Sequence, residues 1–107
     1  MIKCYAHIKR SETCHIKVCG HATKAPHGFD IVCAGISALV QTLAIYVLKI
    51  CPLAYVRIES GDAYIKADDK SGDIFKLFDM TFCGICEIQK QYPEYIKTLS
   101  LCPKQKN

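Results

Sequence analysis

The sequence predicts an α+β fold: a two-layer sandwich with two helices packed on one face of a mostly antiparallel, four- to five-stranded sheet. Two observations lead to this prediction. Apolar and polar residues alternate in paired stretches, as in half-buried hairpins, and each pair is followed by a long segment with helical spacing of apolar residues. The resulting order, ββαββαβ over 107 residues, fits one domain covering residues 1–107.

The first hairpin is predicted by two alternating stretches that flank a polar turn. Apolar residues occupy every second position from Ile2 to Ile8 and again from Cys14 to Val18. His7 and His15 are therefore expected side by side on the polar face of the sheet. A loop containing glycine and proline follows over residues 20–29.

The first helix is expected to begin with Asp30 as its N-cap and to cover Ile31–Ile50, before Pro52 stops it. No charged residue occurs between Ile31 and Leu48, which approaches the length of a transmembrane helix. Polar residues in its middle, such as Gln41, and amphipathic strands on both sides favour a buried core helix. We therefore expect no membrane partner.

The second half of the chain repeats this pattern. Alternating stretches at 55–59 and 63–68 predict a second hairpin, and apolar residues at helical spacing predict a helix over 73–91. Pro93 ends that helix, and residues 95–101 can form a last strand before a polar tail.

The composition is that of an ordinary globular protein, with 50% hydrophobic residues, 22% charged residues and a net charge of +4. The chain has eight cysteines, but its first ten residues lack the pattern of a secretory signal. We therefore expect a reduced, cytoplasmic protein. Residues 1–29 carry a net charge of +4, which either attracts an anionic group such as a thiolate or RNA phosphate or is simply a solvated face.

Cys33 is the strongest candidate for chemistry from the residues alone. As the third residue of a helix capped by Asp30, it would lie at the positive helix end, where a thiol loses its proton more readily. Unpaired backbone N–H groups of Cys33 and Ala34 could then stabilise an oxyanion. Ala34 and Gly35 are small, which would let a substrate backbone come close.

His21 is the candidate general base, because Gly20 permits an unusual backbone turn that can bring the loop back towards Cys33. His27 is a second candidate. An isolated cysteine and histidine in one sequence are weak evidence for a catalytic pair.

The exact residue order is more specific. Gly20-His21-Ala22, followed by Gly28-Phe29-Asp30-Ile31-Val32-Cys33-Ala34-Gly35-Ile36-Ser37, resembles the ribosomal-processing cysteine protease family, Prp. The resemblance implies a homodimeric cysteine protease with Cys33 as nucleophile and His21 as base, without metal or cofactor. It also implies a substrate: the N-terminal extension of a bacterial large-subunit ribosomal protein (number twenty-seven), cut after paired aromatic residues. The loop 22–29, which includes Gly28, would open for that precursor peptide.

Two nearby residues have alternative roles. Asp30 can cap the helix or orient His21, and the cap is favoured. Ser37, one turn after Cys33, can hydrogen-bond in the site or to the carbonyl of Cys33.

Other features are less specific. Cys83 and Cys86 form a single CxxC pair, interpreted as core residues rather than a metal site. Tyr5, Tyr55 and Tyr64 are interspersed with basic residues on the predicted strands, a composition that can bind RNA, but no RNA-binding motif accompanies them. We interpret them as sheet surface and leave nucleic-acid binding open. The alternative function is a non-enzymatic ribosome- or RNA-associated module.

Overall fold

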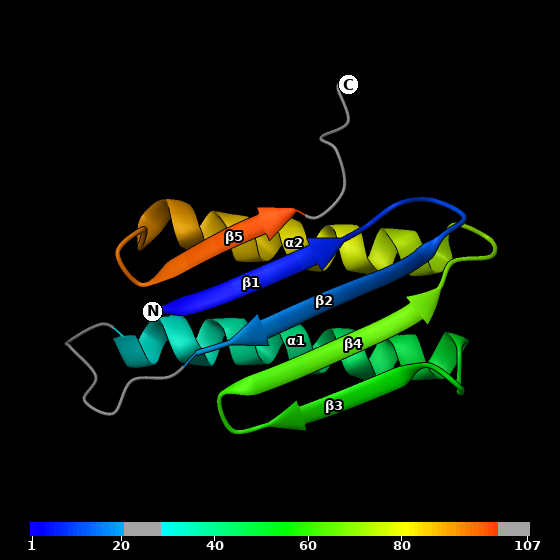
Figure 1. The fold of residues 1–107 in the computed structure, drawn as a ribbon, viewed down its shortest axis with the longest axis horizontal. Helices are drawn as coiled ribbons and strands as arrows, with labels where there is room; N and C mark the ends of the chain where they lie inside the picture. The colour runs from blue at the N-terminus through cyan, green and yellow to red at the C-terminus, as the bar shows by residue number, and fades with distance from the viewer. Residues whose placement is uncertain (21–28, 101–107) are drawn as a thin grey trace.

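A computed structural model describes residues 1–20 and 29–100 of the chain. Two helices lie on one face of a five-stranded sheet whose strand order is β3-β4-β2-β1-β5 (Figure 1). In chain order the elements are β1 (Ile2–His7), β2 (Thr13–Cys19), α1 (Phe29–Ile50), β3 (Tyr55–Glu59), β4 (Asp62–Asp68), α2 (Asp73–Gln91) and β5 (Ile96–Ser100). The predicted fold class and element order are confirmed.

The sheet is mixed rather than purely antiparallel. The pairs β1–β2, β2–β4 and β3–β4 are antiparallel, whereas β5 returns through α2 to pair with β1 in parallel. His7 lies opposite His15 in the first hairpin, and their rings stack with centroids 5.9 Å apart, as the alternation predicted.

The core lies between the sheet and the helices. Alternate residues of β1, β2 and β4 point inward, including the fully buried Cys4, Ile16 and Ile65. The helices contribute Val47 of α1 and Phe78 of α2, both with no exposed surface. Burying these side chains supplies most of the stabilisation, at roughly 25 cal/mol per Å² of apolar surface.

Gly35 and Gly84 allow α1 and α2 to pack closely. A Cβ at Gly35 would lie 3.1 Å from Cδ1 of Ile88, and one at Gly84 would lie 3.1 Å from Cδ1 of Leu39. Gly35 therefore makes room for α2 and not for a substrate backbone, which corrects the expectation from its small size.

The side of α1 away from the core is apolar as well. Ile31 and Ile45 are more than half exposed, and Leu53, just after the helix, is 96% exposed. By length and composition alone, Asp30–Ile50 could cross a membrane, a test that the core helix of a soluble protein also passes. The predicted contact of α1 with the core is observed through residues such as Val32, Val40 and Val47.

The seven cysteines in the described part of the chain are free thiols. Burial raises the pKa of Cys4 to about 12, so this thiol is inert at neutral pH. Cys86 is partly buried but Cys83 is exposed. The interpretation of Cys83 as a core residue is therefore wrong. Among the described residues, no three metal-binding side chains gather into a potential metal site.

The start of α2 is held by a buried aspartate. Asp69, 5% exposed, accepts hydrogen bonds from the backbone N–H groups of Ser11 (2.8 Å), Gly72 (2.9 Å) and Phe75 (3.0 Å). One carboxylate thus joins the β1–β2 turn to the first turn of the second helix. These hydrogen bonds, together with the nearby Arg10 charge, lower the pKa of Asp69 below its ordinary value.

Replacing Asp69 by alanine is expected to lower the melting temperature by several degrees at pH 7, because three backbone donors lose their acceptor. Since the folded pKa is depressed, this stabilisation is present above the ordinary carboxylate pKa of about 4 and is lost as the pH falls through the folded value. Thermal unfolding of wild type and Asp69→Ala at pH 7 and pH 3 should show a difference that shrinks in acid. A difference unchanged by pH would contradict a role for the ionised carboxylate.

Candidate active site

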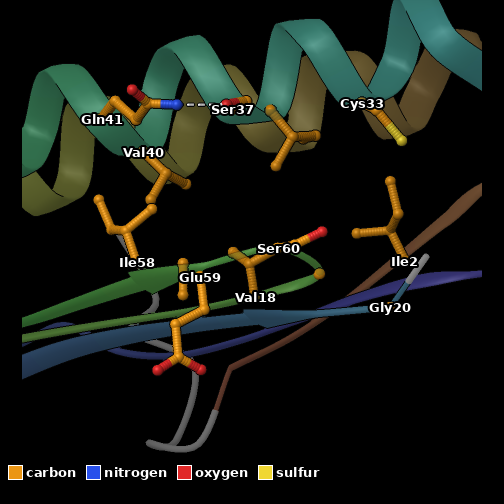
Figure 2. A pocket seen from close by; sticks show the side chains of 13 residues that line it. Ile2, Val18, Gly20, Cys33, Ser37, Val40, Gln41, Ile58, Glu59 and Ser60 are labelled. Atoms are coloured by element: carbon orange, nitrogen blue, oxygen red, sulfur yellow. Dashed lines mark hydrogen bonds between the residues drawn. The ribbon is translucent and has the colours of Figure 1, made fainter.

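A pocket of about 290 Å³ opens between α1 and the sheet, next to Cys33 (Figure 2). Its apolar walls come from the helix and the inner side of the sheet: Ile2, Val18, Ile36, Val40, Ile58 and Ala63. Its polar lining comes from α1 and from the β3–β4 turn: Ser37, Gln41, Glu59 and Ser60. The size is at the lower end of the range for small-ligand sites.

Cys33 lies on the flank of α1 that lines this pocket. Cys33, Ser37 and Gln41 are spaced at i, i+4 and i+8, so they share one side of the helix. In Figure 2 the sulfur of Cys33 points away from the helix, towards Ile2 at the start of β1. The thiol is partly exposed, so a molecule in the pocket can reach it.

The beginning of α1 differs from the expectation. The helix starts at Phe29, so Asp30 lies within the first turn instead of at the N-cap. In a helix that starts there, the N–H groups of Cys33 and Ala34 pair with carbonyls four residues earlier. The predicted use of these two N–H groups as an oxyanion hole is therefore wrong. Ala34 is exposed and does not line the pocket.

The electrostatics of Cys33 also differ from the expectation. Burial is the largest influence and raises the pKa of the thiol, and the negative charge of Asp30 raises it further. The position near the helix start does not by itself activate the sulfur. A nucleophilic Cys33 therefore needs a base or cation to stabilise its thiolate.

Replacing Asp30 by asparagine is expected to lower the pKa of Cys33, because a carboxylate that disfavours the thiolate is removed. The alkylation rate of Cys33 at pH 7.5 should then rise by about two- to fivefold, as the thiolate fraction follows the pKa. Mass spectrometry of the Cys33 peptide after timed iodoacetamide treatment measures this rate. A slower reaction would instead indicate that Asp30 supports the base.

Ser37 has a partner within the pocket. Its hydroxyl accepts a hydrogen bond of 2.6 Å from the side-chain amide of Gln41 (Figure 2). Gln41 was not recognised from the sequence as a site residue. The spacing of eight residues from Cys33 was the available indication, since it places both on one helix face.

Gly20 closes the end of the pocket at β2. Its φ of +124° lies in the region that favours glycine, and its N–H donates to the Gly61 carbonyl at 3.0 Å. This bond joins the end of β2 to the β3–β4 turn, and Ser60 of that turn and the adjoining Glu59 of β3 line the pocket. The expected unusual backbone at Gly20 is confirmed.

His21, His27, Gly28 and most of the loop 22–29 lie outside the described residues. The predicted approach of His21 to Cys33 is therefore not tested by the geometry. Gly20, which directly precedes His21, lines the same pocket as Cys33.

A partly exposed thiol in a mostly apolar pocket, on a two-layer α+β fold, is suited to a cysteine-dependent hydrolase. The sequence model of the cysteine protease Prp family matches residues 1–97. The chain belongs to this family and is a cysteine protease, which confirms the resemblance seen in the sequence.

Solved structures share the fold. The ribosomal processing protease Prp of Staphylococcus aureus, in complex with a substrate peptide, has a TM-score of 0.79 at 20% identity, covering 94% of this chain and 99% of that one. The same protease with a covalently linked product peptide has a TM-score of 0.72 at 22% identity, with the same coverage. A Streptococcus mutans protein has a TM-score of 0.72 at 24% identity, covering 94% and 93%. Comparison with curated proteins gives no significant match.

Proposed function

We propose that this chain is an endopeptidase that removes the N-terminal extension of a bacterial large-subunit ribosomal protein (number twenty-seven), with Cys33 as nucleophile and His21 as base. The observation that carries the proposal is the Cys33 thiol, which opens into a pocket in a chain of the Prp protease family. The Staphylococcus aureus structures, named as a ribosomal processing protease with substrate and with covalently linked product peptides, support the substrate class.

The proposed reaction is acyl transfer through the sulfur. His21 takes the thiol proton as Sγ of Cys33 bonds to the scissile carbonyl carbon. The carbon–nitrogen bond then breaks, and His21 returns the proton to the leaving amine. Water, deprotonated by His21, attacks the thioester, releases the acyl fragment and restores the thiol. The raised pKa of Cys33 fits this scheme, because a thiol that is neutral alone requires the base.

The pocket walls are consistent with a preference for aromatic residues before the cleavage site. Ile2, Val18, Ile36 and Val40 contribute aliphatic surface to the pocket that Cys33 also lines. Transferring an aromatic ring onto such surface removes a large apolar area from water and anchors the peptide. Ser37 and Gln41 lie along the same wall, where they can hydrogen-bond to a peptide backbone.

The experiment is cleavage of a synthetic peptide that covers the extension and the first residues of the mature ribosomal protein. The expected result is one cut, after the second residue of the aromatic pair, with products identified by mass spectrometry. A matched peptide with alanine in place of both aromatic residues should be cut at least tenfold more slowly. Absence of cleavage, or equal rates for the two peptides, would contradict the proposal.

The homodimer and the cytoplasmic location are part of the same proposal. A second copy would cover the exposed apolar side of α1, where Ile31, Ile45 and Leu53 otherwise face solvent. Sedimentation equilibrium is expected to give the mass of two chains. A single-chain mass at micromolar concentration would contradict the dimer.

The non-enzymatic alternative is not supported, because the family match identifies a protease.

A further inference from the structure

The outer face of the sheet is not covered by either helix, since α1 and α2 both lie behind the opposite face (Figure 1). Its side chains are those that alternate with the buried residues of each strand. This open face is separate from the pocket next to Cys33, because the apolar walls of that pocket come from the inner side of the sheet.

A line of aromatic rings crosses four neighbouring strands on this face. His7 of β1 stacks on His15 of β2 with centroids 5.9 Å apart, and His15 lies 5.7 Å from Tyr64 of β4. Tyr64 in turn lies 5.7 Å from Tyr55 of β3. All four rings are at least partly exposed. The sheet thus holds four aromatic rings at a nearly constant spacing, with interplanar angles from 20° to 60°.

Cations flank this line. Lys17 lies opposite Tyr64 in the β2–β4 register, Lys66 lies opposite both His15 and Tyr55, and Lys3 occupies the neighbouring row. These three lysines are exposed and take part in none of the ion pairs found among the described residues.

Other charged groups on this face are already paired. Arg57 lies 5.8 Å from the Tyr64 ring but forms an ion pair with Asp62 at 2.8 Å. Asp68 accepts a hydrogen bond from Thr13, so two of the carboxylates on the face are already engaged.

Aromatic rings on an open sheet, surrounded by unpaired lysines, match the chemistry of a single-stranded nucleic acid. Bases stack on exposed rings, and phosphates are attracted to the cations. Burial, His7 and Lys66 lower the pKa of His15, so its ring is neutral at pH 7 and stacks as an aromatic surface. An acidic peptide would use the lysines but would leave the row of rings without a partner.

We propose that the open sheet face, through His7, His15, Tyr55, Tyr64, Lys3, Lys17 and Lys66, binds single-stranded RNA independently of the protease site. This goes beyond the proposed function, because it adds a second ligand on the opposite side of the sheet from Cys33.

The probe is a fluorescein-labelled, mixed-sequence RNA of twelve nucleotides, titrated with the full chain and followed by anisotropy. Three phosphate contacts predict a salt slope of about −2 for a single strand, so affinity should fall about twentyfold between 50 and 200 mM salt. Tyr55→Ala and Tyr64→Ala should each weaken binding by at least about fivefold, whereas Tyr64→Phe, which keeps the ring, should bind like wild type.

The charge test compares two substitutions that remove the same charge. Lys17→Gln is expected to weaken binding and make the salt slope less negative by about 0.7, whereas Lys76→Gln, on α2 in the other layer, should have little effect. None of these variants should change kcat/KM on a short peptide substrate, and thermal melting confirms that each is folded.

Three results would overturn the proposal. The first is an absence of binding at 50 mM salt. The second is equal affinity for single-stranded RNA, duplex RNA and polyglutamate, which would indicate charge attraction alone or an acidic protein partner. The third is an equal effect of Lys17→Gln and Lys76→Gln, which would show that the sheet face is not the site.

Discussion

Replacing Cys33 by alanine is expected to reduce kcat/KM on the ribosomal precursor peptide by more than about 10⁴-fold. The reason is that, in the proposed mechanism, this sulfur forms the covalent bond to the acyl group, and no other thiol lines the described pocket. Cys33→Ser should be nearly as inactive. Burial raises the pKa of the Cys33 thiol, and a serine hydroxyl at this position ionises far less readily still. The measurement is the initial rate of peptide cleavage at several substrate concentrations.

The matched control for this experiment is Cys83→Ser. Cys83 is an exposed thiol on α2 and does not line the pocket, so its loss tests whether removing any cysteine matters. Its kcat/KM should stay within about twofold of wild type. The melting temperatures of the Cys33 variants should also remain close to that of wild type, since the side chain is only partly buried. If Cys33→Ser kept a tenth or more of the wild-type rate, Cys33 would not be the nucleophile.

Local patterns were sufficient to predict the fold class. The core-facing side chains can be predicted from the alternation of apolar residues in β1 and β2 and from their helical spacing in α2. The strand order was not predictable in the same way, because β5, at the end of the described chain, pairs with β1, at its beginning. That pairing depends on contacts between residues far apart in the sequence. The pattern of apolar residues within β5 therefore does not indicate its partner strand.

The candidate site was likewise only partly predictable from local sequence patterns. Cys33 was found from its place in the sequence, but the β3–β4 turn was missed because Glu59 and Ser60 reach the pocket only through the β2–β4 register. The helix start was misplaced because Asp30 has a strong preference for the cap position, yet Phe29 is already helical. That small shift changes the chemistry, since it pairs the N–H groups that had been assigned to an oxyanion hole.

The pKa of Cys33 follows from burial more than from the helix end. A partial charge of about half a unit acts within the first turn, whereas desolvation acts on the whole thiolate. Both burial and Asp30 oppose ionisation. The proposed mechanism therefore depends on a base for Cys33, which the proposal assigns to His21, the residue directly after Gly20.

Gly20→Ala is expected to have the largest effect on stability among the substitutions at the site. A Cβ at this position would lie 2.4 Å from the Met1 carbonyl oxygen and 3.0 Å from Cα of Ile2. Both are backbone atoms, so relief requires β1 to move and not merely a side chain to rotate. The φ of +124° adds strain for any residue with a Cβ. Together these effects should cost about 3 kcal/mol or more.

Activity should fall together with stability in this variant. Moving Gly20 disturbs its 3.0 Å hydrogen bond to Gly61 and displaces the adjoining His21, so kcat/KM should drop even at temperatures where the protein stays folded. Urea unfolding gives the stability change, and peptide cleavage at 15 °C gives the activity.

Gly35→Ala is the matched control for Gly20→Ala, because it adds the same methyl group to another glycine of the pocket-forming region. There the new Cβ would meet only Cδ1 of Ile88 at 3.1 Å, the tip of a side chain that can rotate. The backbone is helical, and alanine gains up to about 1 kcal/mol over glycine in a helix, which offsets the crowding. The free energy of unfolding of Gly35→Ala should therefore lie within about 1 kcal/mol of the wild-type value. If Gly20→Ala were equally mild, the close approach of β1 and the end of β2 would not be what positions the segment leading to His21.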